Sequence, residues 1–200
     1  GRVLTALAAV AGSYCAAVSY DLMALRSAGV RVRLDRIALA SFVATSFSNN
    51  IGFGILTGGS VRLRLYSSWD VSVREVAGVM LFFATCLWSG FFFLTGIALL
   101  FDPPILPFGI SLPSSGLRPL GVFLLSLVAA YALLTIFVRR PLRIGALSLP
   151  LPRPAIVPVQ LLVSVSDWAA TAATLYVLLP EGAAGNFGHF LAIYLVSLTI

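Results

Sequence analysis

Long apolar runs separated by short polar, basic or proline-rich links dominate the chain. A helix that crosses a bilayer needs about 20 predominantly apolar residues, and several of the runs reach or approach that length. The pattern predicts an all-α fold, a polytopic transmembrane helix bundle, with spans over about residues 3–25, 73–101, 120–138, 155–179 and 189–200.

The stretch from Ile37 to Val61 has a different character, because polar residues and glycines replace the apolar ones after Phe47. It is too short for two full crossings. If it enters and leaves the membrane on one side, all 13 arginines except Arg2 and Arg118 lie on the same face, as the positive-inside rule favours. We therefore predict a Gly-rich re-entrant segment over about residues 37–61, made of a helix, a break and a short return. Irregular backbone at that depth is tolerated where protein or a wet cavity satisfies it.

Composition agrees with a membrane location. Hydrophobic residues make up 60% of the chain and charged residues 10%, and the mean hydropathy is +1.02. Soluble domains carry about 25% charged residues, so this chain could not cover its own surface in water. The net charge of +6 comes from arginines that mostly flank apolar runs. This placement indicates contact with the lipid bilayer and its anionic headgroups, and no direct contact with nucleic acid.

The chain offers little for metal or covalent chemistry. Cys15 and Cys86 lie inside apolar runs without a Cys-x-x-Cys spacing, which is typical of packing thiols. His189 is the only histidine, so we expect no metal, no cofactor and no catalytic residue within residues 1–200. Both ends fall beside or inside apolar runs, and we interpret the chain as a fragment of one transmembrane domain.

The segment from Ser48 to Ser60 is the most informative part of the sequence. Its glycines let the backbone bend and approach a ligand closely, and its hydroxyl and amide side chains are uncharged donors and acceptors. Broken segments near mid-membrane often mark transport sites. Helix packing through Gly54-x-x-x-Gly58 is the alternative explanation for the glycines. The candidate substrate-binding residues here are Asn49, Asn50, Gly58 and Gly59.

Charged residues beside or inside the apolar runs complete the candidate site. Arg62 and Arg64 lie about 200° apart on a helix, so only one can face the interior. Guanidinium is the preferred group for bidentate phosphate binding, although such a pair could simply anchor to headgroups, and Tyr66 follows closely. Asp21 lies at the end of the first run and Asp167 well inside the run over 155–179. Acidic residues inside a span are costly and usually face a cavity or a partner.

A longer pattern extends from Tyr20 to about Trp69. It reads Tyr20-Asp21-Leu22-x-Ala24-Leu25-Arg26, Ala40-Ser41-Phe42, Phe47-Ser48-Asn49-Asn50-x-Gly52-Phe53 and Thr57-Gly58-Gly59-Ser60-x-Arg62-x-Arg64-Leu65-Tyr66. This pattern resembles the membrane domain of the multiple peptide resistance factor family, the bacterial lysylphosphatidylglycerol synthase/flippase proteins.

The resemblance implies a multi-pass protein of the bacterial cytoplasmic membrane with a phospholipid substrate. In that family a flippase region moves aminoacylated phosphatidylglycerol to the outer leaflet, which confers resistance to cationic antimicrobial peptides. A soluble C-terminal synthase domain makes the lipid from aminoacyl-tRNA. By this resemblance the chain is the flippase half, Asp21 and Arg62 contact substrate, and a fused synthase domain lies outside it. A homo-oligomer is compatible with this interpretation.

We therefore expect translocation of aminoacylated phosphatidylglycerol from the inner to the outer leaflet. Arg62 would contact the phosphate, and Asp21 or Asp167 the ammonium. Two alternatives stay open. The helices could present lipid to a fused phosphatidylglycerol lysyltransferase domain, or they could export another lipid-linked substrate.

Overall fold

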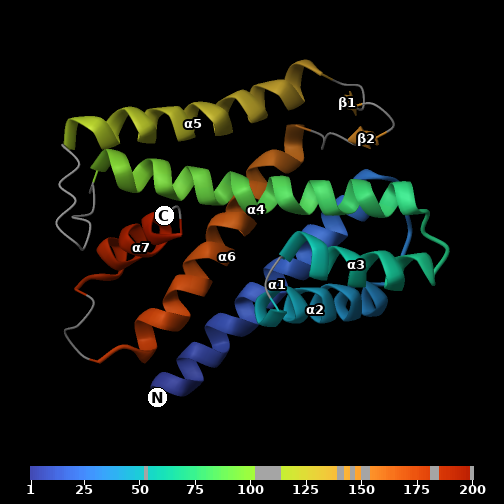
Figure 1. Ribbon diagram of the computed structural model, residues 1–200, viewed down its shortest axis with the longest axis horizontal. Helices are drawn as coiled ribbons and strands as arrows, with labels where there is room; N and C mark the ends of the chain where they lie inside the picture. Colours follow the sequence, from blue (N-terminus) through green and yellow to red (C-terminus); the bar gives the residue numbers. More distant parts are fainter. Residues whose placement is uncertain are drawn as a thin grey trace. The chain divides into compact units, whose positions relative to one another are not determined.

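The computed structural model describes residues 1–51, 54–101, 114–138, 142–144, 147–149, 154–180 and 185–198. Helices dominate this part of the chain (Figure 1). They are α1 (Arg2–Ser27), α2 (Leu34–Ile51), α3 (Gly54–Ser67), α4 (Val73–Phe101), α5 (Ser114–Phe137), α6 (Val157–Leu178) and α7 (Phe187–Ser197). A 3-10 turn, η1 (Pro154–Ile156), precedes α6, and two short strands, β1 (Leu142–Ile144) and β2 (Leu147–Leu149), form an antiparallel pair with Leu142 opposite Leu149.

Four helical segments are long and apolar enough to cross a membrane. They are α1, α4, α5 over Leu117–Phe137, and α6 with its preceding turn over Pro154–Leu178. The shorter α7 is also apolar. The predicted fold class, a helical membrane bundle, is confirmed, and the three-residue strands are the departure from an all-helical chain in the described residues.

The Gly-rich segment is more regular than its sequence indicates. Ser48 to Ile51 belongs to α2, and α3 begins at Gly54 and continues through Gly58 and Gly59. The expectation of irregular backbone is therefore wrong for these residues, because the glycines take part in helix packing and keep helical hydrogen bonding. Gly52 and Phe53, where the break was predicted, lie outside the described residues. The re-entrant position of this helix pair in a bilayer stays a prediction.

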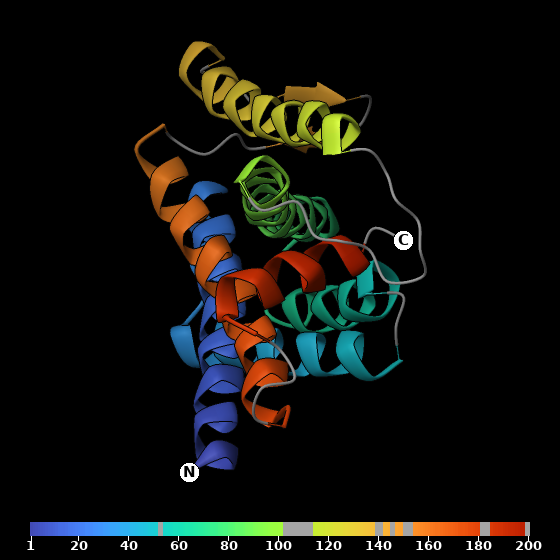
Figure 2. The same ribbon diagram turned by 90° about the vertical axis from the view of Figure 1, so that its left-hand side faces the viewer.

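The chain divides into two compact units, and the candidate residues from Asp21 to Tyr66 lie in the second one. This second unit comprises residues 14–87 and 134–160. Within it α2 and α3 lie antiparallel, side by side, in both ribbon views (Figures 1 and 2). Its largest fully buried side chains include Tyr20, Leu25, Ile37 and Tyr66.

Two similar turns fix the ends of α1 and α3. After α1 the Val30 amide donates to the Leu25 carbonyl at 2.9 Å, with Gly29 in the left-handed region at φ 75°. After α3 the Val71 amide donates to the Tyr66 carbonyl at 3.1 Å, and Asp70 takes the left-handed position at φ 63°. Both turns have the 6→1 bond of a Schellman motif, which closes a helix with a sharp change of direction. The two motifs therefore fix the positions at which α1 and α3 end.

The first unit comprises residues 1–13, 88–133 and 161–200. Small residues bring its helices together, as is common where helices pack in lipid. The Gly90 amide of α4 donates to the Ser164 hydroxyl of α6 at 3.1 Å. Gly96 and Gly121 let α4 and α5 approach, since a Cβ at Gly121 would lie 2.9 Å from the Gly96 carbonyl oxygen.

Candidate functional site

A buried ion pair joins α1 and α3. The Arg62 Nε donates to both oxygens of the Asp21 carboxylate, at 3.1 Å to Oδ1 and 3.0 Å to Oδ2. The side chains are only 5% and 0% exposed, respectively. The Tyr66 hydroxyl donates to Asp21 Oδ2 at 3.0 Å. Burial and the neighbouring carboxylate raise the pKa of the Tyr66 hydroxyl, so it stays a proton donor.

Helix geometry explains why these three side chains meet. Arg62 and Tyr66 are four residues apart on α3 and therefore share one face, which points at Asp21 of α1. The guanidinium carbon of Arg62 also lies 4.3 Å from the centre of the Phe83 ring of α4. A cation over an aromatic face is attracted by the ring quadrupole, more strongly when water is excluded. The guanidinium is thus held from the carboxylate side and the ring side at once.

The pair leaves part of the guanidinium unused. Because Nε makes both bonds to Asp21, the two terminal nitrogens point elsewhere, and within the described residues Nη2 is buried without a hydrogen-bond partner. The hydroxyl oxygens of Ser41 and Thr45 on α2 are also buried without a hydrogen-bond partner among the described residues. Ser41 is fully buried and lies beside the Asp21 carboxylate, to which it can donate. The unused terminal nitrogen of Arg62 could therefore serve an additional acceptor.

Gly58 sets how closely α2 approaches α3 next to this pair. A Cβ at Gly58 would overlap the Ser48 hydroxyl oxygen and lie 3.0 Å from the Ala44 carbonyl oxygen and 3.3 Å from Arg62 Nη1. A Cβ at Gly59 would instead meet the thioether end of Met80. Both glycines are buried. Gly58 supports the site through packing, which agrees with the small-residue explanation of this segment.

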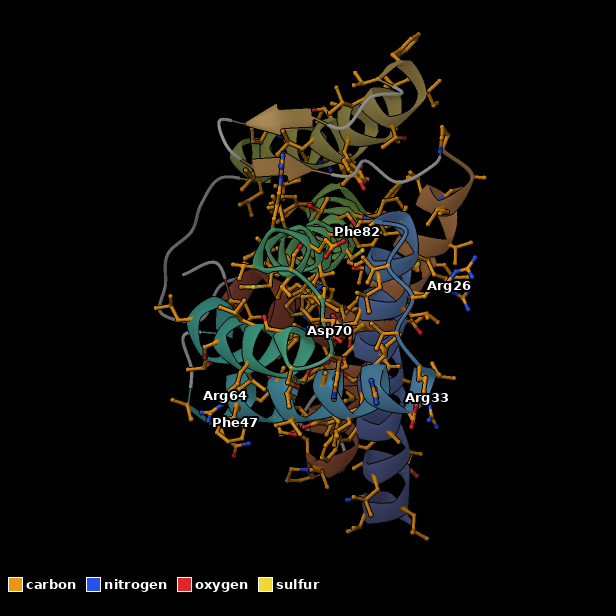
Figure 3. The ribbon with its side chains drawn as sticks, turned by 90° about the vertical axis from the view of Figure 1, so that its right-hand side faces the viewer. Arg26, Arg33, Phe47, Arg64, Asp70 and Phe82 are labelled. Carbon is orange, nitrogen blue, oxygen red and sulfur yellow. The ribbon has the colours of Figure 1, made fainter. Side chains whose placement is uncertain are left out.

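The other predicted residues of this region lie outside the cluster. Asn49 and Asn50 are exposed, and the Asn50 amide donates to the Ser46 carbonyl of its own helix at 2.8 Å. Arg64 is also exposed. Figure 3 shows Arg64 projecting outward, as do Arg26 and Arg33. Arg62 is thus the buried member of the arginine pair.

Asp167 belongs to the first unit and has different partners. It is 7% exposed. The Ser13 hydroxyl of α1 donates to its Oδ1 at 2.5 Å, and the Ser13 and Thr171 hydroxyl oxygens are 3.5 Å apart. Thr171 also donates to the Asp167 backbone carbonyl at 2.9 Å. The structure therefore places the two candidate carboxylates, Asp21 and Asp167, in separate units.

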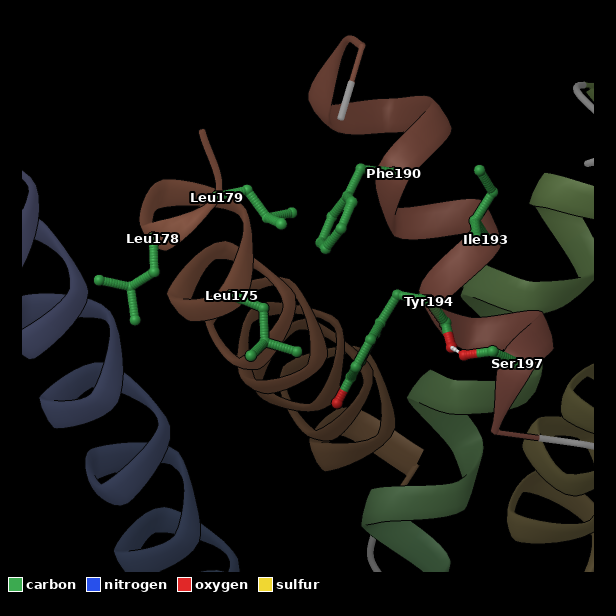
Figure 4. A pocket seen from close by; sticks show the side chains of 7 residues that line it. All are labelled: Leu175, Leu178, Leu179, Phe190, Ile193, Tyr194 and Ser197. Atoms are coloured by element: carbon green, nitrogen blue, oxygen red, sulfur yellow. Dashed lines mark hydrogen bonds between the residues drawn. The ribbon is translucent and has the colours of Figure 1, made fainter. Parts of the chain in front are cut away.

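An apolar pocket lies between α6 and α7 in the first unit. It has a volume of about 440 Å³. Figure 4 shows the side chains that line it, among which the Tyr194 and Ser197 hydroxyls are the polar groups. The lining residues are Leu175, Leu178, Leu179, Phe190, Ile193, Tyr194 and Ser197. None of the residues predicted to bind substrate lines this pocket, whose lining is mostly apolar.

Sequence reasoning missed several partners of the candidate residues. These are Ser41, Phe83 and Ser13. For Ser41 the sequence contains a local signal, since its hydroxyl and that of Thr45, four residues further on, share a helix face. For Ser13 there was none, because its partner lies 154 residues away. Among the described residues, no group of three or more His, Cys, Asp or Glu side chains could hold a metal ion.

Comparison with known proteins places the chain among membrane proteins. It is similar to the uncharacterized protein slr0712 of Synechocystis sp., with 31% identity over 196 residues, and to the inner membrane protein YbhN of Escherichia coli, with 29% identity over 197 residues. Each match covers 98% of this chain and 61% of the relative, so the chain spans about three fifths of the length of these curated relatives. No protein-family model matches it. With its four candidate spans, the chain is a multi-pass inner membrane protein.

Proposed function

We propose that this membrane domain translocates aminoacylated phosphatidylglycerol, such as lysylphosphatidylglycerol, from the inner to the outer leaflet. The observation that carries the proposal is the state of Arg62. Its guanidinium is buried and anchored through Nε, while Nη2 lacks a partner among the described residues. An unpaired buried donor costs about 1–3 kcal/mol, and more on a charged group. A phosphate oxygen is an acceptor that would remove this cost, and guanidinium suits phosphate particularly well.

Exchange of ionic partners gives a route for binding. A lipid with one phosphate and an aminoacyl ammonium carries both charges of the Asp21–Arg62 pair in one headgroup. The phosphate takes the place of Asp21 on Arg62, and the ammonium takes the place of Arg62 on Asp21. Neither buried charge is left alone in this exchange. That matters because an uncompensated buried charge costs about 3–5 kcal/mol.

The buried Ser41 hydroxyl beside the Asp21 carboxylate offers a further donor for the phosphate oxygens. Thr45 lies one helical turn further along the same face of α2. Tyr66 keeps Asp21 oriented through its own hydrogen bond. Phosphate recognition in this proposal therefore uses α2 and α3, and recognition of the amine uses α1.

Two other functions are compatible with the same cluster. The domain could present phosphatidylglycerol to a fused lysyltransferase, which is relevant because the relatives extend beyond the region matched by this chain. It could also export another lipid-linked phosphate. A purely structural ion pair between α1 and α3 is the remaining explanation, and it predicts no selective effect on lipid transport.

Outer-leaflet labelling of aminoacyl lipid in cells tests the proposal. The measured quantity is the outer-leaflet lipid divided by total aminoacyl lipid and by protein level. Arg62→Lys keeps the charge but loses the planar fork, and Asp21→Asn removes the anion, so both should lower the ratio. Arg64→Lys is the matched control, since Arg64 is exposed two residues away.

The outcomes separate the explanations. A lower ratio for Arg62→Lys and Asp21→Asn, with Arg64→Lys unchanged, supports translocation. A fall in total aminoacyl lipid with an unchanged ratio favours presentation to a synthase. If all three variants accumulate normally and neither quantity changes, the pair is structural and the proposal is wrong.

A further inference from the structure

Arginines cluster where α1 ends and α2 begins. Residues 26–36 contain four arginines and one acidic residue, and all five side chains are exposed. We call the four arginines the basic rim; they are Arg26, Arg31, Arg33 and Arg36. Arg33 pairs with Asp35 at 3.1 Å, whereas no carboxylate among the described residues lies within ion-pair distance of the other three. The basic rim therefore keeps most of its positive charge for an external partner.

The local backbone turns the basic rim outward. The Schellman turn after α1 changes the direction of the chain. In the link that follows, the two valines are half-buried, while Arg31 and Arg33 between and after them are exposed. Figure 3 shows Arg26 and Arg33 projecting on one side of the second unit and Arg64 on the other side. The rim is thus a one-sided surface, and Arg64 is an exposed arginine that does not belong to it.

Arg36 is the member of the rim that is held in place by an aromatic ring. Its guanidinium carbon lies 5.5 Å from the centre of the Trp69 ring, and Trp69 packs edge-on against Tyr66 with 6.0 Å between ring centres. Because Arg36 is in the first turn of α2 and Trp69 follows the end of α3, this contact joins the ends of the two helices. A cation over a ring is held by the ring quadrupole without a hydrogen bond, so Arg36 keeps its N–H donors for an acceptor.

A phosphate diester in a lipid headgroup is the acceptor that this surface fits. Guanidinium binds phosphate through paired N–H donors, and clusters of about four to eight basic residues next to a membrane span attract anionic lipids. The rim begins where α1, a candidate span, ends, and tryptophan is enriched at the membrane interface. A headgroup of the surrounding bilayer could therefore reach Arg36 and Trp69 without leaving the interface.

We propose that the basic rim and Trp69 bind the headgroup of an anionic phospholipid such as phosphatidylglycerol, at a site separate from Arg62. The phosphate contacts Arg36, and the other arginines add longer-range attraction. Two acidic residues, Asp35 and Asp70, lie on or beside this surface, so the four arginines outnumber them and favour a headgroup of net negative charge. A lysyl headgroup carries more positive than negative charge and is disfavoured here. The proposal does not depend on lipid translocation.

Quenching of Trp69 fluorescence by brominated lipids tests this binding. The protein has three tryptophans, and Trp88→Phe with Trp168→Phe leaves Trp69 as the fluorophore. This variant is reconstituted in phosphatidylcholine vesicles that contain increasing amounts of brominated phosphatidylglycerol or brominated phosphatidylcholine. Phosphatidylglycerol should reach half-maximal quenching at a mole fraction about fivefold lower or more. Arg36→Gln should reduce this preference about fivefold, the contribution expected of one basic residue near an anionic surface, whereas Arg64→Gln should leave it unchanged.

The outcomes decide between this site and its alternatives. Equal quenching by the two lipids overturns the proposal, and so does a preference that Arg36→Gln leaves unchanged or that Arg64→Gln reduces equally. Inorganic phosphate, compared with chloride at equal ionic strength, should not relieve the quenching; relief would assign the rim to free phosphate and overturn the lipid site. Native mass spectrometry of the protein with all three tryptophans makes the same comparison by counting bound phosphatidylglycerol and phosphatidylcholine, so the test does not require the tryptophan variant to fold.

Discussion

Replacing Gly58 by alanine should loosen the contact between α2 and α3 beside Arg62. The added methyl group would overlap the Ser48 hydroxyl oxygen and lie 3.0 Å from the Ala44 carbonyl oxygen. Ser48 has little freedom to move, because its hydroxyl donates to that same carbonyl at 2.9 Å. The two helices would have to separate, and Arg62 Nη1, 3.3 Å from the new methyl group, would shift with them.

The magnitude follows from two opposing terms. Overpacking a tight contact costs about 1–3 kcal/mol, whereas exchanging glycine for alanine within a helix gains up to about 1 kcal/mol. Gly59→Ala has the same propensity gain, but its methyl group meets the end of Met80, a flexible side chain that can adapt. The comparison of the two variants cancels the propensity term. We expect Gly58→Ala to be less stable than Gly59→Ala by about 1–2 kcal/mol.

Thermal unfolding of the purified protein in detergent measures this difference. At about 2–4 °C per kcal/mol for a chain of this size, the midpoint of Gly58→Ala should lie roughly 2–8 °C below that of Gly59→Ala. Adding Ser48→Ala to Gly58→Ala removes the closest clashing atom and should restore part of the loss. Equal midpoints for the two glycine variants, or no recovery in the double variant, would refute the packing role of Gly58.

Three further predictions concern the same unit. Asp21→Leu alone, or Arg62→Met alone, should lower the free energy of unfolding by about 3–5 kcal/mol, because each leaves one buried charge without its partner. The double variant should be close to wild type in stability. If thermal unfolding shows that the two losses add, the result contradicts a direct ion pair. Tyr66→Phe removes a hydrogen bond to a charged group and should cost about 1.5–3 kcal/mol, measured against the exposed-site control Ser67→Ala. Single cysteines at Arg31 and Ser67 should react with an impermeant thiol reagent from the same side of the membrane, and labelling from opposite sides would show that α2 and α3 together span it.

The sequence predicts the helices well because their physical cause is local. A helix that crosses a bilayer must present apolar side chains over its whole length, and this requirement is visible without knowledge of the fold. The segment around Gly58 was harder to predict. Glycine disfavours helix in isolation, but contacts with Ala44 and Ser48 on α2 outweigh that preference, and such contacts are tertiary.

Individual site residues were predictable to different degrees. A helical separation of about 200° means that only one of Arg62 and Arg64 can be buried, but the identity of the buried one depends on the position of α1. Asp21 and Arg62 are 41 residues apart, and their proximity follows from the turn after α1 together with the return of α3. No local sequence pattern predicts the Ser13–Asp167 hydrogen bond, because the two residues are 154 positions apart.

The lengths of α2 and α3 have a consequence for the surrounding lipid. At 1.5 Å per residue, their 18 and 14 residues give about 27 Å and 21 Å, shorter than the roughly 30 Å hydrocarbon core of a bilayer. If α2 and α3 enter and leave the membrane on one side, as we predict from the charge pattern, neither helix is long enough to reach the opposite surface. A headgroup bound at Arg62 would then remain on the side from which the pair enters, and its passage to the other leaflet would need a further movement of the lipid or of the protein.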